Sequence, residues 1–432
     1  MEEAEATIRA LTNGRFLIRQ PEFFKLWAGQ AVSAFGSAIT TVALPLTAVV
    51  VLHVSTLQMA VLAAVGVVPH LLFGLVAGVW VDRLPRRSVL VTADLGRAAL
   101  LGTIPVLAVL RLLHVEYLYA IAFLAGVMAL LFDTASMSVL PALVGRNSRD
   151  DLTRANSLMI LSTSVAGTAG PSAAGGLVQL LTAPLAIAFD AASFLVSAGC
   201  SLLVVMPQAS ARRTRIHVLR EIAEGMRAVF DSPVLSAVTI SATVGALGGA
   251  MQAALIVLYA VRDLHLTPTL VGLAVAVSGC ASILGSLLAP ASTRRLGSGP
   301  AYITGQLLSA VAGLVLAAAR GPLAAVALFV LVGQLLRGLG LPLFAIPQRT
   351  LRQALVPDEM LGRVNATWRF LVFGAQPAGA LLGGALGTAL GLRSALVGGG
   401  LVMFAAVAWA AVSPLRGLRE IPEQHPASSR AS

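Results

Sequence analysis

The stretch Gly74–Arg97 reads GLVAGVWVDRLPRRSVLVTADLGR, and it decides the fold class of the chain. An apolar run ends at the charged segment 82–87, DRLPRR, and a second apolar run begins directly after it. Between two membrane spans, so short and so charged a turn must lie at a water interface. Gly74 and Gly78 stand one helical turn apart, which would leave one helix face free of side chains and let a neighbouring backbone approach.

The composition indicates a membrane protein. Of the 432 residues, 57% are hydrophobic and only 11% are charged, whereas soluble proteins carry roughly 25% charged residues. A span needs about 20 apolar residues, and the unbroken apolar runs do not fit alternating transmembrane strands. We therefore expect an all-α membrane protein whose twelve spans cover residues 22–51, 56–81, 88–110, 117–144, 155–181, 183–206, 234–261, 267–292, 300–319, 321–348, 363–389 and 391–413.

The basic residues predict the orientation of these spans, because cytoplasmic loops are enriched in arginine and lysine. Most arginines fall in loops on one side, among them Arg83, Arg86, Arg87, Arg146, Arg149, Arg154, Arg212, Arg213, Arg294 and Arg295. The opposite loops hold Arg111, Arg262, Arg320 and Arg393. Both termini are thus expected in the cytoplasm of a protein of the cell (inner) membrane. This topology explains the net charge of +11 without a nucleic-acid partner.

The longest interior loop divides the chain into two sets of six spans. Residues 1–206 form the expected N-terminal bundle, 207–233 the linker, and 234–432 the C-terminal bundle with a short cytoplasmic tail. Apolar residues recur at helical spacing over 216–230, which predicts an amphipathic helix on the cytoplasmic face. A linker that is helical without any regulatory role fits the pattern equally well.

The charged turn carries the pattern G-x-x-x-D-R-x-x-R-R, formed by Gly78, Asp82, Arg83, Arg86 and Arg87. This pattern resembles the loop between helices 2 and 3 of the major facilitator superfamily. A simple stop-transfer cluster would explain the arginines, but neither Asp82 nor the glycines. The chain departs from the family at Pro85, where the family usually has glycine.

In that family the loop acts as a gating latch. The resemblance implies that Asp82 approaches the start of the span near residues 363–369, where a helix N-terminus favours an anion. It also implies that Arg86 and Arg87 reach Asp94 or another acid at that level. The corresponding loop of the second half keeps arginines but has no acid, so the latch would be one-sided.

The fifth span contains a glycine–proline segment that would bend a helix and let it pack closely. It resembles the G-P-x-x-G-G signature of the fifth helix in drug–proton antiporters, with one additional residue before the glycine pair. Ordinary packing of small residues is the alternative interpretation. The residues concerned are Gly170, Pro171, Gly175 and Gly176.

Ionisable residues inside spans are costly, so each is a candidate for function. Asp133 in span 4 and Arg337 in span 10 lie at mid-depth, in spans that line the cavity of a major facilitator, and they could face each other. Asp133 is the first candidate for proton coupling and Asp94 the second. Asp94 and Arg97, three residues apart, are more simply a structural ion pair.

Two other groups of polar residues lie inside the spans. Asp190, in a supporting span by the same analogy, is interpreted as structural. Gln30, Ser33 and Ser37 of span 1 could supply further polar contacts to a ligand in the cavity.

The sequence offers no support for catalysis. A Walker loop needs a Gly-Lys-Ser/Thr step, and the single lysine is Lys25. There is no HExxH or CxxC motif, and Cys200 and Cys280 lie in apolar runs, so we expect no enzyme, no cofactor and no metal.

Three further segments narrow the resemblance. Residues 27–37, 189–194 and 361–364 resemble the enterobactin-exporter-like and macrolide-efflux-like branch of the major facilitators. The resemblance implies two six-helix bundles and a monomeric secondary transporter. It would export a bulky amphipathic small molecule (a drug, antibiotic or siderophore) by alternating access, coupled to protons. Uptake or facilitated diffusion of a metabolite, and a non-transporting membrane protein, are the alternatives.

Overall fold

The computed structural model describes residues 20–74, 76–144, 149–205 and 218–419. This described part is helical and contains no strand. Eleven of its helices are long and apolar enough to cross a membrane. The remaining expected span corresponds to α8, Arg149–Leu180, which is 32 residues long but begins with charged residues and carries serine and threonine residues further along. An all-α membrane fold is therefore confirmed.

The helices of the first half follow the expected spans with two differences. α8 begins before its expected start at residue 155, and the second span divides into α4 and α5. The helices are α3 (Pro21–Leu46, continued by the π-helical turn η1, Thr47–Val51), α4 (Thr56–Phe73), α5 (Ala77–Arg83), α6 (Arg86–Val109), α7 (Val115–Val144), α8 (Arg149–Leu180) and α9 (Ala183–Leu203).

The second half begins with a short helix and continues with six long ones. These are α10 (Val218–Asp231), α11 (Pro233–Arg262), α12 (Pro268–Leu296), α13 (Ser298–Ala318), α14 (Leu323–Leu355), α15 (Asp358–Leu390) and α16 (Leu392–Val412). The 3-10 turn η2, Pro414–Gly417, follows α16.

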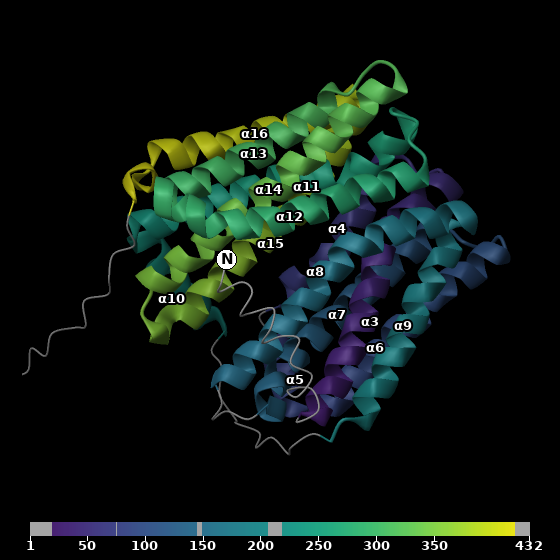
Figure 1. Cartoon of the computed structure of the whole chain (residues 1–432), viewed down its shortest axis with the longest axis horizontal. Helices are drawn as coiled ribbons and strands as arrows, with labels where there is room; N and C mark the ends of the chain where they lie inside the picture. The colour runs from purple at the N-terminus through teal and green to yellow at the C-terminus, as the bar shows by residue number, and fades with distance from the viewer. Residues whose placement is uncertain (1–19, 75, 145–148, 206–217, 420–432) are drawn as a thin grey trace, which may run out of the picture. The chain divides into compact units, whose positions relative to one another are not determined.

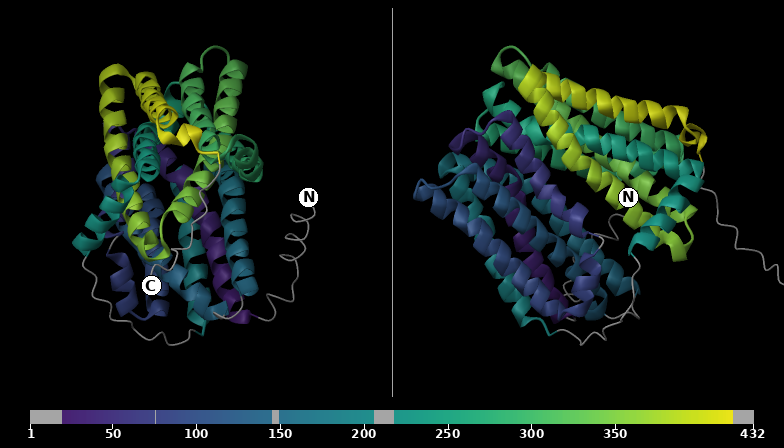
Figure 2. Two further views of the ribbon diagram at one scale, coloured as in Figure 1. Left: turned by 90° about the vertical axis from the view of Figure 1, so that its left-hand side faces the viewer. Right: turned by 180° about the vertical axis from the view of Figure 1, so that it is seen from behind.

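The chain forms two compact units. The first unit comprises Met1–Arg215 and Ala260–Ala276, and the second comprises Ile216–Tyr259 and Val277–Ser432. In the first unit α3 packs against α8 and α9, and α6 packs against α7 and α9 (Figure 1). In the second unit α13 packs against α14 and α16, while α15 packs against α10 and α16 (Figure 2).

The second expected span is not one continuous helix. α4 ends at Phe73 and α5 begins at Ala77, so Gly74 and Gly78 do not share a face of one helix. A Cβ on Gly74 would lie 2.2 Å from the His70 carbonyl oxygen, which favours glycine where the chain leaves α4. Around Gly78, the described residues place no atom outside the local helix backbone within 4 Å of the position of a Cβ. Among these residues, no close backbone approach to Gly78 is present in this conformation.

Among the described residues, Arg86 and Arg87 of the charged turn bond to backbone carbonyl groups and not to an acid. Arg86 Nη1 donates to the Ser138 carbonyl oxygen of α7 at 3.0 Å, and Arg87 Nη2 donates to the Leu202 carbonyl oxygen in the last turn of α9. The expected contact with Asp94 is not formed by these arginines, because Asp94 lies two turns further along α6. The expected contact with another acid at that level stays a prediction.

The structure shows fewer contacts for Arg83 and Asp82, the other two charged residues of the turn. The Arg83 side chain is exposed. The side chain of Asp82 lies outside the described residues, so its approach to the start of α15 stays a prediction.

The linker contains the expected helix. α10 packs on α15, where Glu224 Oε2 forms an ion pair with Arg363 Nη1 at 2.7 Å. At Gly225 a Cβ would lie 2.4 Å from Thr367 Oγ1 and 2.6 Å from the Arg363 carbonyl oxygen, so the two helices touch through their backbones here. The linker helix thus packs on the second and third turns of α15.

Candidate functional site

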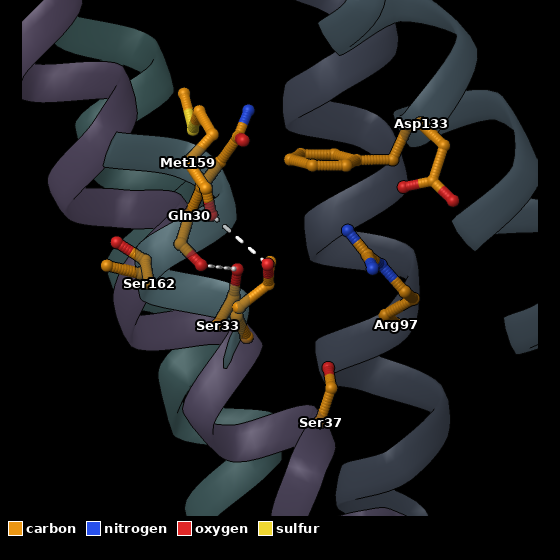
Figure 3. Close-up of a pocket in the computed structure, with 11 residues that line it drawn as sticks. Gln30, Ser33, Ser37, Arg97, Asp133, Met159 and Ser162 are labelled. Carbon is orange, nitrogen blue, oxygen red and sulfur yellow. Dashed lines mark hydrogen bonds between the residues drawn. The ribbon is translucent and has the colours of Figure 1, made fainter. Parts of the chain in front are cut away.

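The first unit contains a pocket of about 190 Å³ between α3, α6, α7 and α8 (Figure 3). Sites for drug-sized ligands measure roughly 300–1,000 Å³, so this pocket can hold part of such a molecule. Four of its residues were predicted from the sequence. The lining residues are Gln30, Ala31, Ser33, Ala34, Ser37, Arg97, Phe132, Asp133, Met159, Ser162 and Thr163.

One face of α3 supplies the polar groups on one side of the pocket. Gln30, Ser33 and Ser37 recur every three to four residues, so they share a helix face. Gln30 Nε2 donates to the Ser136 hydroxyl of α7 at 2.6 Å, and Ser33 Oγ donates to the Gln30 carbonyl oxygen at 3.2 Å. The structure thus brings these three predicted residues together.

Arg97 and Asp133 lie on the opposite side of the pocket from Gln30 and Ser162 (Figure 3). Arg97 is only 9% exposed, and its guanidinium lies 4.5 Å from the ring centroid of Phe132 and 4.1 Å from that of Phe194. Contacts of this kind attract a cation to the ring faces. The two rings therefore fix the guanidinium at the wall of the pocket.

Several acids contribute to the surroundings of Arg97. Arg97 Nη2 lies 2.5 Å from Asp94 Oδ1, so the structure contains the ion pair expected from their spacing. Asp94 itself is fully buried. Asp133 lines the same pocket as Arg97, and Asp190 on α9 contributes to the electrostatic environment of the guanidinium. Asp94 is the acid that the structure shows in direct contact with Arg97.

Sequence reasoning missed two features of this site. Arg97 was interpreted as a structural partner of Asp94 and not as a pocket residue, and Asp190 was interpreted as structural, with no partner named. Gly36 could have pointed to Asp190, because a Cβ at this position would lie 2.6 Å from Asp190 Oδ1. A glycine that precedes Ser37 on a polar helix face is, however, a weak signal when read alone.

Arg337 belongs to α14 in the second unit, where its side chain is partly buried. Among the described residues, it has no hydrogen bond or ion pair in the structure. Its expected position opposite Asp133 stays a prediction.

The glycine–proline segment of α8 makes close backbone contacts. At Gly170 a Cβ would lie 2.5 Å from the Ala38 Cβ of α3, and at Gly175 it would lie 2.8 Å from the Pro268 carbonyl oxygen at the start of α12. A Cβ on Gly272 would in turn lie 2.3 Å from the Pro171 carbonyl oxygen. This is the close packing expected from the segment, although in the described part of the chain no atom lies within 4 Å of the position of a Cβ on Gly176. It explains why residues 260–276 group with the first unit.

Comparison with known proteins decides the family. The family model described as "transmembrane secretion effector" matches residues 16–430, nearly the whole chain. The chain belongs to this family of the major facilitator superfamily. It is a multi-pass membrane transporter of small molecules and not an enzyme.

Several curated relatives of this transporter are named as efflux proteins or exporters. It is 28% identical to the multidrug efflux pump Tap of Mycolicibacterium fortuitum, over 87% of this chain and 91% of that protein. It is 24% identical to macrolide efflux protein A of Streptococcus pyogenes, over 92% and 97% of the two chains. It is 27% identical to the enterobactin exporter EntS of Citrobacter koseri, over 95% and 97%.

Solved structures confirm the fold. A bacterial homologue of the iron transporter ferroportin, in an inward-facing state, has a TM-score of 0.71 at 20% identity and covers 91% of this chain and 97% of its own. The nucleoside transporter NupG has a TM-score of 0.70 at 13% identity, with 90% and 98% covered. These identities support the major facilitator fold alone.

Proposed function

We propose that this transporter exports bulky, amphipathic small molecules across the cell membrane by alternating access, in exchange for protons. The observation that carries the proposal is the pocket of the first unit. Alanine, phenylalanine and methionine side chains alternate there with hydroxyl, amide and charged groups. Such a lining suits a partly apolar molecule with a few polar groups better than a sugar, which needs a dense set of hydrogen bonds.

The direction of transport is proposed from the relatives. The three curated relatives named above are an efflux pump, an efflux protein and an exporter, and each is covered over more than nine-tenths of its length. The names of these relatives indicate different substrates, from macrolides to a siderophore. We therefore propose as substrate a drug, an antibiotic or a siderophore, and no single compound. The transporter would act as a monomer, with both termini in the cytoplasm.

Proton coupling is proposed for the acids of the site. Asp133 lines the pocket, where it is accessible to the substrate and, in the state open to the outside, to protons. Asp94 lies behind the pocket in its ion pair with Arg97. A proton taken up from outside and released to the cytoplasm would supply the energy for export.

Alternating access requires contacts that form in one state and break in another. The packing of Gly175 against Pro268 and of Gly272 against Pro171 is a candidate for the outer gate, because it joins the end of α8 to the start of α12. The charged turn around Asp82, which precedes α6, is the candidate for the inner latch.

The proposal is tested in inverted membrane vesicles and in proteoliposomes, with ethidium, erythromycin and enterobactin as probes. We expect at least one probe to move out of the cytoplasmic compartment when a proton gradient is imposed. Asp133→Asn keeps the shape of the side chain and removes its charge, so it should abolish probe-driven proton movement while probe binding persists. Asp151→Asn, a change in the partly exposed ion pair with Arg154, is the matched control and should leave transport intact.

Two outcomes would contradict this proposal. Movement of the probes only down their own gradient, in either direction, would establish facilitated diffusion or uptake. Export by the Asp133→Asn protein with unchanged pH dependence would remove Asp133 from the coupling reaction and make Asp94 the next candidate.

A further inference from the structure

Arg352 is a buried arginine near the end of α14 in the second unit. It is 7% exposed, and its guanidinium lies 3.8 Å from the ring centroid of Trp368 on α15. Arg97 of the first unit is 9% exposed and also lies against aromatic rings, but it holds an ion pair with Asp94. Among the residues whose side chains the structure describes, no acid pairs with Arg352. Arg352 therefore has the ring contact without the counter-charge.

The hydrogen-bond donors around this guanidinium also have no partner. Nε and Nη1 of Arg352 are buried without a hydrogen bond in the described part of the chain, and so are Nε2 of Gln348 and the indole Nε1 of Trp368. Gln348 is 3% exposed and precedes Arg352 by one helical turn, so the two side chains lie on the same face of α14. Three neighbouring side chains thus present four buried donor atoms and no acceptor for them.

Such a group of donors needs an anion. An arginine stays charged in a protein, so it cannot escape burial by losing its proton. A buried charge is costly unless it is paired and hydrogen-bonded, and the face of an aromatic ring attracts the cation without replacing an oxygen acceptor. A phosphate group offers several acceptor oxygens at once and matches the two parallel N–H groups of a guanidinium. It would satisfy both the charge and the donors.

The position of the group favours a lipid as the source of the phosphate. Arg352 lies in the last turn of α14, at the expected cytoplasmic end of this membrane helix. Trp368 is partly exposed, so the group of donors reaches the surface of the unit. Arg349, one turn before Arg352, and Arg369, next to Trp368, are exposed and add positive charge. Basic pockets between membrane helices on the cytoplasmic side bind the headgroups of anionic lipids.

We propose that Arg352, Gln348 and Trp368 form a binding site for a phosphate group in the second unit. The guanidinium supplies the charge, the amide and the indole supply further hydrogen bonds, and the ring holds the guanidinium in place. An anionic phospholipid and inorganic phosphate both carry this group. A ligand at this site would join α14 to α15. The site lies apart from the pocket of the first unit, and its test needs neither substrate nor gradient.

Thermal unfolding of the full-length, delipidated transporter in detergent tests the site, because a ligand that binds only the folded protein stabilises it. The probes are dioleoylphosphatidylglycerol and sodium phosphate. The controls are dioleoylglycerol, which has the same acyl chains without phosphate, and sodium chloride at equal ionic strength. We expect phosphatidylglycerol to raise the unfolding temperature by several degrees and dioleoylglycerol to leave it unchanged. A shift with sodium phosphate as well would identify a site for phosphate in general. No shift with either probe, or an equal shift with dioleoylglycerol, overturns the inference.

The variant Arg352→Gln distinguishes a ligand site from a structural arginine. Without lipid it should unfold at the same or a higher temperature than the unmodified chain, since it removes an unpaired buried charge. Its affinity for phosphatidylglycerol should be about 10- to 100-fold weaker, because charge-assisted hydrogen bonds are lost. Arg295→Gln, at an exposed arginine near the end of α12, is the matched control and should keep the affinity. A lower unfolding temperature of Arg352→Gln with unchanged lipid affinity would show that Arg352 pairs with an acid of the chain, such as Asp358 or Glu359, whose side chains lie outside the described residues. That result would contradict the proposal.

A second variant keeps the test decisive if Arg352→Gln does not fold. Trp368→Phe keeps a ring beside the guanidinium and removes only the indole N–H. The affinity for phosphatidylglycerol should then fall about 3- to 10-fold, as expected for the loss of one hydrogen bond to a charged group. An affinity unchanged by Trp368→Phe would remove the indole from the site and contradict the proposed set of donors.

Discussion

The two units place different chemistry at equivalent positions. In the first, the first, third and sixth long helices (α3, α6 and α9) enclose Asp94, Arg97 and Asp190. In the second, the corresponding helices (α11, α13 and α16) enclose Ser241 and Gln306, with Ser241 Oγ donating to Gln306 Oε1 at 2.8 Å and lying 3.0 Å from the Ala406 carbonyl oxygen. Gln306 Nε2 donates to the Tyr302 hydroxyl at 2.9 Å.

The comparison distinguishes polar groups that only hold helices together from ionisable groups that can take part in proton coupling. Both groups are buried, and both give three helices polar contacts that fix their relative register. The amides and hydroxyls of the second unit do not change charge between pH 5 and 9, so they hold the helices in every state. The first unit contains groups that can gain or lose a proton. We expect the response to pH and to substrate to reside there.

We expect the largest loss of stability when the Arg97 side chain is removed. Arg97→Ala would leave Asp94 buried without its ion-pair partner, and breaking such a pair typically costs about 3–5 kcal/mol. We expect this variant to express poorly and to unfold at a much lower temperature in detergent, as measured by thermal unfolding. In the second unit, Ser241→Ala removes one neutral hydrogen bond and should cost only about 1–3 kcal/mol. Equal losses in the two variants would show that charge does not distinguish the units.

A second prediction compares two glycines that face these groups. A Cβ on Gly36 would lie 2.2 Å from Ser193 Oγ, whereas a Cβ on Gly245 of α11 would lie 3.1 Å from Gln306 Nε2. Gly36→Ala should therefore cost about 1–3 kcal/mol through overpacking, and Gly245→Ala less than about 1 kcal/mol. Thermal unfolding of the two proteins under one condition measures the difference. An equally mild result at both positions would mean that α3 can move away from Asp190 without strain.

Most of the fold could be predicted from the sequence, because unbroken apolar runs and turn residues are local signals. The break at Gly74 could not, since a glycine inside an apolar run is compatible with a continuous helix. The polar face of α3 was found because its spacing is also local. Asp190 was missed because its neighbours come from α3 and α6, and only packing brings them together. The carbonyl partners of Arg86 and Arg87 were missed for the same reason. Every residue has a backbone carbonyl, so the sequence does not indicate which one an arginine will contact.

We expect the smallest effect on stability from a substitution at Gly78. This substitution tests whether Gly78 is packed closely in another state of the transport cycle. Unlike Gly36, Gly78 has no neighbour among the described residues within 4 Å of the position of a Cβ, so their packing does not require glycine. Gly78→Ala should leave thermal unfolding unchanged within about 0.5 kcal/mol, or stabilise slightly, since alanine is the better helix former. If a backbone approaches Gly78 when the site opens to the other side, export should fall several-fold with protein levels preserved. The same export as the unmodified chain would show that Gly78 has no part in gating and that the motif acts through its charges alone.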